Sequence, residues 1–163
     1  MTDLPAGARA VVITVSDRSA AGTRADTSGP LAAELLAAQG FSVGDVVIVA
    51  DDVDAIVTAL RVAVAGGADL VCTTGGTGLG PRDVTPEATA AVVERVSPGI
   101  ADAIRAAGSD RLPTTILSRG TAGTCGRSLI VNLPGSTGGV RDGIAALAPV
   151  IAHAVHQLRG GDH

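Results

Sequence analysis

Glycine and hydroxyl residues fill the segment Thr73–Gly78, which reads Thr-Thr-Gly-Gly-Thr-Gly. Backbone N–H groups of such a segment can converge on an anion without side chains in the way, and a helix that begins nearby adds a favourable partial charge. The segment has neither the lysine and hydroxyl pair of a Walker A loop nor the spacing of a dinucleotide fingerprint. The glycine pattern alone therefore leaves two interpretations open, an anion-binding loop and a plain turn.

An adjacent cation and carboxylate, Arg82 and Asp83, follow this segment between Pro81 and Pro86. The two prolines restrict the backbone on either side of the pair. Arg82 can clamp a phosphate or pair with a carboxylate. Asp83 can hold a magnesium ion that bridges phosphate oxygens, or cap a helix that we expect to begin at Pro86 with Thr85 as its N-cap.

Carboxylates also end an earlier apolar run, at Asp51 and Asp52. A second carboxylate near Asp83 would complete a site for metal-assisted phosphoryl transfer, in which the ion neutralises developing charge. We predict that Asp52 instead caps the helix that follows it. Two interpretations of Asp51 stay open, a metal-site carboxylate and a solvated surface residue.

Two further segments give weaker signals. Ser118–Gly123 combines small residues with a cation, Arg119, and is another candidate for anion binding. Asn132–Ser136 ends an apolar run with turn residues, and Ser136 could cap the next helix. Each segment taken alone is a weak indication of a site.

The cysteines and histidines lack metal-ligand spacing. Cys72 lies inside an apolar run, which predicts a buried and inert thiol. Cys125 lies in a loop rich in glycine and threonine, where a reactive role stays open. His153, His156 and His163 are predicted to lie at the surface.

Strands and helices must position these segments. Short β-branched runs predict strands, and these are Ala10–Ser16, Ser42–Val49, Ala68–Thr74, Thr114–Leu117 and Ser128–Leu133. Apolar residues at helical spacing predict helices, and these are Ser28–Gln39, Asp52–Ala65, Pro86–Arg95, Pro98–Ala107 and Val140–Leu158, where Pro149 could break the last one. Because strands alternate with helices, we predict one α/β domain over residues 1–163 with a mainly parallel sheet.

Ligands of open parallel sheets bind beyond the carboxyl ends of the strands. The polar segments Ser16–Asp17, Ala50–Asp52 and Thr74–Asp83 each follow a predicted strand. We therefore expect these three loops to form one site.

The composition excludes several classes of partner. The 163 residues are 46% hydrophobic but only 1% aromatic, so the core must consist of aliphatic residues, as in parallel strands buried under helices. The net charge is −4 without a basic run, which argues against a nucleic-acid partner. No apolar run approaches the length of a bilayer span, and Met1–Arg9 has no apolar signal core, so we expect a cytoplasmic protein.

Taken together, the polar segments resemble the MogA/MoaB-type molybdenum cofactor biosynthesis proteins, the molybdopterin adenylyltransferase family. The matching pieces follow one another over nearly the whole chain, and they are Thr14–Asp17, Asp26–Pro30, Thr73–Thr89, Leu117–Arg119 and Ile130–Ser136. The resemblance implies a three-layer α/β/α sandwich of the molybdopterin-binding fold and a homotrimer. It also implies adenylylation of molybdopterin by ATP with Mg²⁺, release of pyrophosphate, and transfer of the product to a molybdate-inserting enzyme.

The same resemblance implies roles for individual residues. Asp51 and Asp83 take the positions of the catalytic carboxylates and of Mg²⁺ ligands, although Ala50 stands where the family usually has a proline. Contacts to substrate or nucleotide are implied for Ser16, Asp17, Thr74, Gly75, Gly76, Thr77, Gly78, Arg82, Ser118, Arg119, Pro134, Gly135 and Ser136. One alternative is a MoaB-like trimer that binds molybdopterin or its precursor without efficient adenylylation. A second is a molybdopterin-binding or scaffolding trimer that serves to deliver molybdopterin to a partner.

Overall fold

The computed structural model describes residues 3–161, and its strands form a single sheet. The strands are β1 (Arg9–Val15), β2 (Ser42–Val43), β3 (Val47–Val49), β4 (Leu70–Thr74), β5 (Arg95–Val96), β6 (Ala122–Cys125) and β7 (Ser128–Leu133). Their order is β2-β1-β4-β7-β6-β5, with β3 also paired to β1. The strands β1, β2, β3, β4 and β7 run parallel, whereas β6 and β5 add an antiparallel edge.

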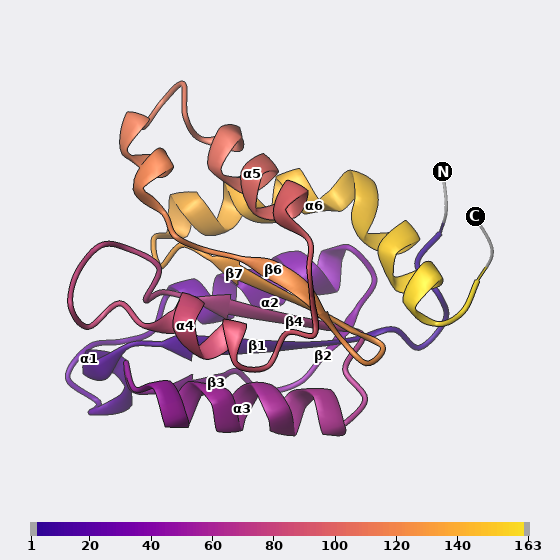
Figure 1. Ribbon diagram of the computed structural model, residues 1–163, viewed down its shortest axis with the longest axis horizontal. Coiled ribbons are helices and arrows are strands. Elements are labelled where there is room, and N and C mark those ends of the chain that lie inside the picture. The colour runs from indigo at the N-terminus through magenta and orange to yellow at the C-terminus, as the bar shows by residue number, and fades with distance from the viewer. Residues whose placement is uncertain (1–2, 162–163) are drawn as a thin grey trace.

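Helices cover both faces of this sheet (Figure 1). They are α1 (Asp17–Ala20), α2 (Ser28–Ala38), α3 (Val53–Ala65), α4 (Thr85–Ala90), α5 (Pro98–Ala107) and α6 (Thr137–Leu158), with a short 3₁₀ helix η1 (Pro113–Leu117). One face carries α2, α5 and α6, and the other carries α3 and α4. The predicted three-layer α/β/α architecture is confirmed.

The side chains of the central strands point alternately to the two faces of the sheet and form two aliphatic cores. Val12, Cys72 and Val131 pack with α2 and α6, while their chain neighbours Ile13 and Val71 pack with α3 and α4. Side chains of successive strand residues point to opposite faces, so a strand buried on both sides must be continuously apolar. The aliphatic composition meets this requirement without aromatic residues.

Strand register brings the carboxyl ends of the parallel strands to one edge of the sheet. Thr14 of β1 pairs with Thr74 of β4, Thr74 pairs with Leu133 of β7, and Val15 pairs with Val49 of β3. The loops after these four strands therefore begin side by side, near α1 in Figure 1. This is the edge where the sequence predicted the site.

Some predicted strands were wrong. Ser42–Val49 is two short strands, because the chain leaves the sheet at residues 44–46. Thr114–Leu117 is not a strand but lies in η1, where Pro113 supplies no N–H and Thr115 N donates three residues back to the Leu112 oxygen at 3.0 Å. The strands β5 and β6 were not predicted, and β6 forms a hairpin with β7 around Gly126, whose φ is +56°.

The helices follow the predictions more closely. The bounds of α2, α3 and α5 lie within one residue of those expected. The helix α4 ends at Ala90 instead of Arg95, because the chain turns there and joins β6 as β5. The helix α6 starts at Thr137, earlier than expected, and continues through Pro149 without a break.

Candidate functional site

The glycine loop, Gly75–Gly80, leaves the end of β4 in a conformation that only glycine adopts easily. The φ angles of Gly75 and Gly76 are +91° and +68°. A Cβ on Gly75 would lie 2.4 Å from the Val15 carbonyl oxygen, so the loop passes directly over the end of β1. The Thr85 hydroxyl donates to the Gly75 oxygen at 2.9 Å, which ties the start of α4 to the loop. Thr85 was predicted as an N-cap, but the cap residue is Val84 and Thr85 holds the loop instead.

Unpaired backbone donors distinguish this loop from a plain turn. Within residues 3–161, the N–H groups of Gly76, Thr77 and Gly78 donate to no protein acceptor. A hydrogen-bonded turn closes with a backbone bond from the N–H of its fourth residue to the oxygen of its first, although many turns lack this bond, and successive free N–H groups in a glycine-rich loop are suited to bind an anion. The geometry therefore favours the first of the two interpretations that the sequence left open.

Two carboxylates, Asp51 and Asp83, lie against this same loop. A Cβ on Gly76 would be 3.2 Å from Asp51 Oδ1, and Cβ atoms on Gly78 and Gly80 would be 2.8 and 2.9 Å from Asp83 Oδ2. Asp51 Oδ2 accepts from Asp17 N at 2.8 Å, and Asp83 Oδ2 accepts from Gly80 N at 2.9 Å. Each carboxylate thus uses one oxygen to accept a hydrogen bond from a backbone N–H group. Asp51 Oδ1 and Asp83 Oδ1 accept no hydrogen bond from the described part of the chain.

Charge and burial act together on Asp51. Desolvation raises its pKa first, and the negative charges of Asp17 and Asp83 raise it further, against the lowering effect of the hydrogen bond from Asp17 N. The positive charge of Arg82 lowers the pKa of Asp51 by a smaller amount. Burial and the neighbouring carboxylates therefore make the ionised form of Asp51 less favourable than it would be in water.

Two carboxylates suit Mg²⁺ if a substrate completes the coordination. Among residues 3–161 there is no group of three or more His, Cys, Asp or Glu side chains that could hold a metal ion. Magnesium, however, commonly binds through one or two carboxylates together with substrate phosphates and water. The free oxygens of Asp51 and Asp83 fit this donor set.

Arg82 pairs with a third carboxylate, Asp17. Its Nε donates to Asp17 Oδ2 at 3.0 Å and its Nη2 to Asp17 Oδ1 at 2.9 Å. These bonds, followed by the bond from Asp51, hold the pKa of Asp17 below its usual range. Of the two roles that the sequence allowed for Arg82, the structure shows the carboxylate pair. The prediction for Asp52 is also confirmed, because its side chain accepts from Ala55 N at 2.9 Å and caps α3.

Arg119 stabilises the glycine loop through hydrogen bonds to backbone atoms. Its guanidinium donates to the backbone carbonyl oxygens of Gly78 at 2.8 Å and Asp83 at 2.6 Å, and it pairs with the carboxylate of Glu87. Its backbone N donates to the Thr77 oxygen at 2.8 Å. In this structure Arg119 therefore orders the loop, and its predicted contact to a ligand stays a prediction.

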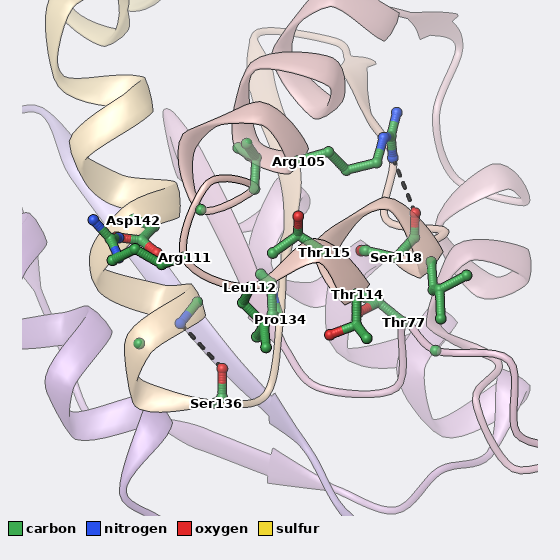
Figure 2. Close-up of a pocket in the computed structure, with 16 residues that line it drawn as sticks. Thr77, Arg105, Arg111, Leu112, Thr114, Thr115, Ser118, Pro134, Ser136 and Asp142 are labelled. Carbon is green, nitrogen blue, oxygen red and sulfur yellow. Dashed lines mark hydrogen bonds and ion pairs between the residues drawn. The ribbon is translucent and has the colours of Figure 1, made fainter.

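A pocket of about 370 Å³ opens on one side of the loop (Figure 2). Five of the predicted contact residues line it, and these are Thr77, Gly78, Ser118, Pro134 and Ser136. The pocket also uses side chains that the sequence did not single out, among them Arg105, Arg111, Leu112, Thr115 and Asp142. Arg105 lies in α5, Thr115 in η1 and Asp142 in α6, while Arg111 and Leu112 lie in the segment between α5 and η1. No local motif marks these residues, because they meet only when the chain folds.

The charged side chains of this first pocket are paired, whereas, over residues 3–161, the Thr115 hydroxyl is not. Arg105 Nη1 donates to the Gly120 oxygen at 2.9 Å, and Arg111 pairs with Asp142. The Thr115 hydroxyl is buried but has no hydrogen-bond partner within the described residues. A buried polar atom without a partner costs stability, so a ligand that bonded to it would gain from this position.

A second pocket of about 350 Å³ lies on the other side and is lined mainly by hydroxyl groups. Predicted residues in it are Ser16, Thr74, Gly75, Gly135 and Ser136. Thr14, Asp26 and Ser28, which were not predicted as site residues, line its floor. Asp26 accepts from the Thr14 hydroxyl at 2.7 Å, and the Ser28 and Thr74 hydroxyls lie 2.9 Å apart.

Close contact between two glycines separates the pockets. A Cβ on Gly135 would lie 3.1 Å from the Gly75 Cα. Ser136 lines both pockets, and its hydroxyl accepts from Gly139 N at 3.0 Å, which confirms that it caps α6. The two pockets are therefore adjacent, with the backbone of Gly75 and Gly135 between them.

The remaining candidate residues lie away from this site. Burial raises the pKa of the Cys72 thiol to about 12, which confirms an inert core cysteine. The Cys125 thiol is partly exposed, and burial followed by the charge of Glu94 raises its pKa as well. His153 is exposed on α6 as predicted, His156 is half-buried, and His163 lies outside the described residues.

Comparisons with known proteins agree with this geometry. Residues 11–153 match the model of a family described as "probable molybdopterin binding domain". The chain belongs to this family. It is 38% identical over 152 residues to the molybdopterin adenylyltransferase of Helicobacter pylori, covering 91% of this chain and 86% of that protein. The predicted resemblance to MogA/MoaB-type proteins is confirmed.

Two other comparisons bear on the fold and on the length of the chain. A solved structure of the molybdopterin biosynthesis Mog protein from Mycobacterium ulcerans superimposes with a TM-score of 0.89 at 49% identity, covering 93% of this chain and 99% of that one. The molybdenum cofactor biosynthesis bifunctional protein of Synechococcus elongatus is 44% identical over 97% of this chain, which spans about half (50%) of that relative. Within residues 3–161, no helix is long and apolar enough to cross a membrane.

Proposed function

We propose that this chain adenylylates molybdopterin, using ATP with Mg²⁺ and releasing pyrophosphate. The observation that carries the proposal is the placement of Asp51 and Asp83 on one glycine loop, each with a carboxylate oxygen left free. A relative that the chain covers over most of its length is a molybdopterin adenylyltransferase, which supports the same chemistry.

The two pockets suit the two reactants. The first pocket has apolar walls from Ile104 and Leu112 and the unpaired Thr115 hydroxyl, and we assign it to the pterin ring. The second has hydroxyls and Asp26 on its floor, and we assign it to the ribose side of the nucleotide. Both reactants carry phosphates, which would then meet where the pockets join, beside Gly75.

The chemistry needs positioning and charge neutralisation more than proton transfer. The terminal phosphate oxygen of molybdopterin forms a bond to the α-phosphorus of ATP, and the bond from that phosphorus to the bridging oxygen of pyrophosphate breaks. A phosphate monoester has its second pKa near 6, so the nucleophile is mostly ionised at neutral pH and needs no strong base. This fits a site whose ionisable groups are carboxylates and arginines.

The chain's own groups would offset the repulsion between the two anions. The N–H groups of Gly76, Thr77 and Gly78 supply donors that need no rearrangement as charge develops. Asp51 and Asp83 would hold Mg²⁺, which supplies positive charge to the phosphate oxygens when bound. Holding both phosphates in one orientation supplies the remaining advantage.

The test is the reaction itself. Wild-type protein with molybdopterin, Mg²⁺ and ATP should form adenylylated molybdopterin and an equal amount of pyrophosphate. Asp51→Asn and Asp83→Asn should each lower the rate at least about a hundredfold, the usual scale for loss of one group that stabilises a transition state, and should still bind molybdopterin. Asp54→Asn removes a nearby exposed carboxylate in the first turn of α3 and should leave the rate unchanged.

Binding of molybdopterin without formation of adenylylated product would refute the proposed enzymatic activity. It would leave the alternative, a MoaB-like module that binds molybdopterin. The same samples test two further parts of the proposal, a homotrimer and transfer of product to a molybdate-inserting enzyme. Light scattering gives the mass in solution, and a purified molybdate-inserting enzyme should consume the product. A monomer at working concentration would contradict the first of these.

A further inference from the structure

Arg82 lies next to the proposed Mg²⁺ carboxylates but binds neither of them. It is the chain neighbour of Asp83, and the charge of Asp51 contributes to its raised pKa after the larger effect of Asp17. Its guanidinium makes its hydrogen bonds to both oxygens of Asp17. The side chain of Arg82 is 69% exposed, so packing does not hold it in this orientation.

Asp17 is in turn fixed to Asp51 by two reciprocal bonds. Asp17 N donates to Asp51 Oδ2 at 2.8 Å, and Asp51 N donates to Asp17 Oδ1 at 3.0 Å. The first bond sets the rotation of the Asp51 carboxylate, whose other oxygen then lies beside Gly76. The second bond places the Asp17 carboxylate between Asp51 and the guanidinium of Arg82.

We propose that Asp17 is a positioning residue, which holds Arg82 away from Asp51 and Asp83 so that their free oxygens stay open to the metal of a metal–nucleotide complex. This inference rests on the proposed function. A guanidinium binds any nearby carboxylate in the same forked geometry. Without Asp17 as its partner, Arg82 would pair with Asp51 or Asp83 and occupy the oxygens that the metal needs.

The expected effect follows from competition between Arg82 and the metal. At the upper end of the range for exposed pairs, a guanidinium–carboxylate pair forms with an equilibrium constant of about five. A ligand's apparent affinity falls by the fraction of protein that remains competent to bind it. Loss of the Asp17 charge should therefore weaken metal–nucleotide binding about fivefold.

The experiment uses the full chain with Mn²⁺ as the probe and α,β-methylene ATP, which cannot be cleaved at the α-phosphorus. Free Mn²⁺ is measured by electron paramagnetic resonance for wild type, Asp17→Asn, Arg82→Gln and the double variant, each against the same nucleotide without protein, because the nucleotide itself binds Mn²⁺. Asp17→Asn is chosen because the amide oxygen can still accept from Asp51 N, and Asp17 N is backbone and stays in place. Asp54→Asn is the control for loss of one nearby negative charge.

Asp17→Asn should bind Mn²⁺ about fivefold more weakly, and adding Arg82→Gln to it should restore wild-type affinity. Unchanged affinity in Asp17→Asn would overturn the inference. So would a loss that Arg82→Gln does not restore, because a purely structural role of Asp17 would not depend on Arg82. If wild type binds no Mn²⁺ with the nucleotide, the metal-dependent function fails as well, whereas normal wild-type binding with unaltered variants refutes only the role of Asp17.

Discussion

An ion pair at the end of the sheet opposite the site should contribute measurably to stability. Asp69 precedes β4 and is 7% exposed, and Arg159 follows α6. Arg159 Nε donates to Asp69 Oδ1 at 2.7 Å and Nη2 to Asp69 Oδ2 at 2.8 Å, and Arg9 N donates to Oδ2 at 2.8 Å. The pair joins residues 90 positions apart and ties the end of α6 to the sheet.

The expected cost of Asp69→Asn lies between the values for surface and buried pairs. Exposed pairs contribute up to about 1 kcal/mol, and breaking fully buried ones costs roughly 3–5 kcal/mol. Asp69 is buried while its partner's side chain is 30% exposed, so we expect about 2 kcal/mol at neutral pH. For a chain of this length, that corresponds to a Tm about 4–8 °C lower.

The pH dependence gives a sharper test. The hydrogen bonds from Arg159 hold the pKa of Asp69 below its usual range, so the folded state binds the proton less readily than the unfolded state. The stabilisation is therefore present above the unfolded pKa of about 4 and is lost as the pH falls through the folded pKa. Urea unfolding of wild type and Asp69→Asn should show a difference that is constant from pH 7 to about 5 and shrinks below it.

Asp102→Asn is the matched control, because its pair with Arg105 joins residues three apart and Asp102 is 69% exposed. It should change the free energy of unfolding by less than about 0.5 kcal/mol. A Tm for Asp69→Asn within 1 °C of wild type, or a difference that grows toward acid pH, would refute the reasoning.

Two further predictions concern the site and its support. Binding of Mn²⁺ should weaken as the pH is lowered, starting above the usual range of a carboxylate, because the pKa of Asp51 is raised and its protonated form binds metal poorly; an affinity that stays unchanged down to about pH 4 would contradict this. Asn132 joins β7 to Thr73 and Thr89 through its Nδ2 and accepts from Thr121 N, at distances of 2.9–3.1 Å. Asn132→Leu removes three hydrogen bonds, two of them buried and one partly buried, at about 1 kcal/mol each, so thermal unfolding should report a loss of about 3 kcal/mol; a loss below about 1 kcal/mol would show that the network adds little.

The position of the site was predictable because it depends on strand ends. A β-branched run followed by Asp or Gly marks where a strand stops, and parallel strands stop at one edge. This reasoning placed Asp51, Asp83 and the glycine loop together, and it identified Asp52 as a cap from its position before α3. None of these inferences required knowledge of a long-range contact.

The errors occur where the local signal is weak and a distant partner decides. The strand β5 has two residues and exists because Glu94 N and Ser97 N bond to β6 carbonyls at 2.8 Å. The apolar pair Ile116–Leu117 suggested a strand, but both side chains are exposed, at 71% and 48%, and the segment curls as η1. A segment of two to five residues carries too little periodicity to separate these outcomes.

The two arginines of the site show the same limit in its chemistry. Arg82 follows the glycine-rich segment and Arg119 lies between Ser118 and Gly120, so the sequence offers both as candidates for a phosphate contact. Arg119, however, bonds to the carbonyls of Gly78 and Asp83, 41 and 36 positions away, and its removal would loosen the loop before it removed any ligand contact. We therefore expect the N–H groups of the loop to make the first contacts with a phosphate. An experiment that replaced only the arginines would assign the phosphate to the wrong place.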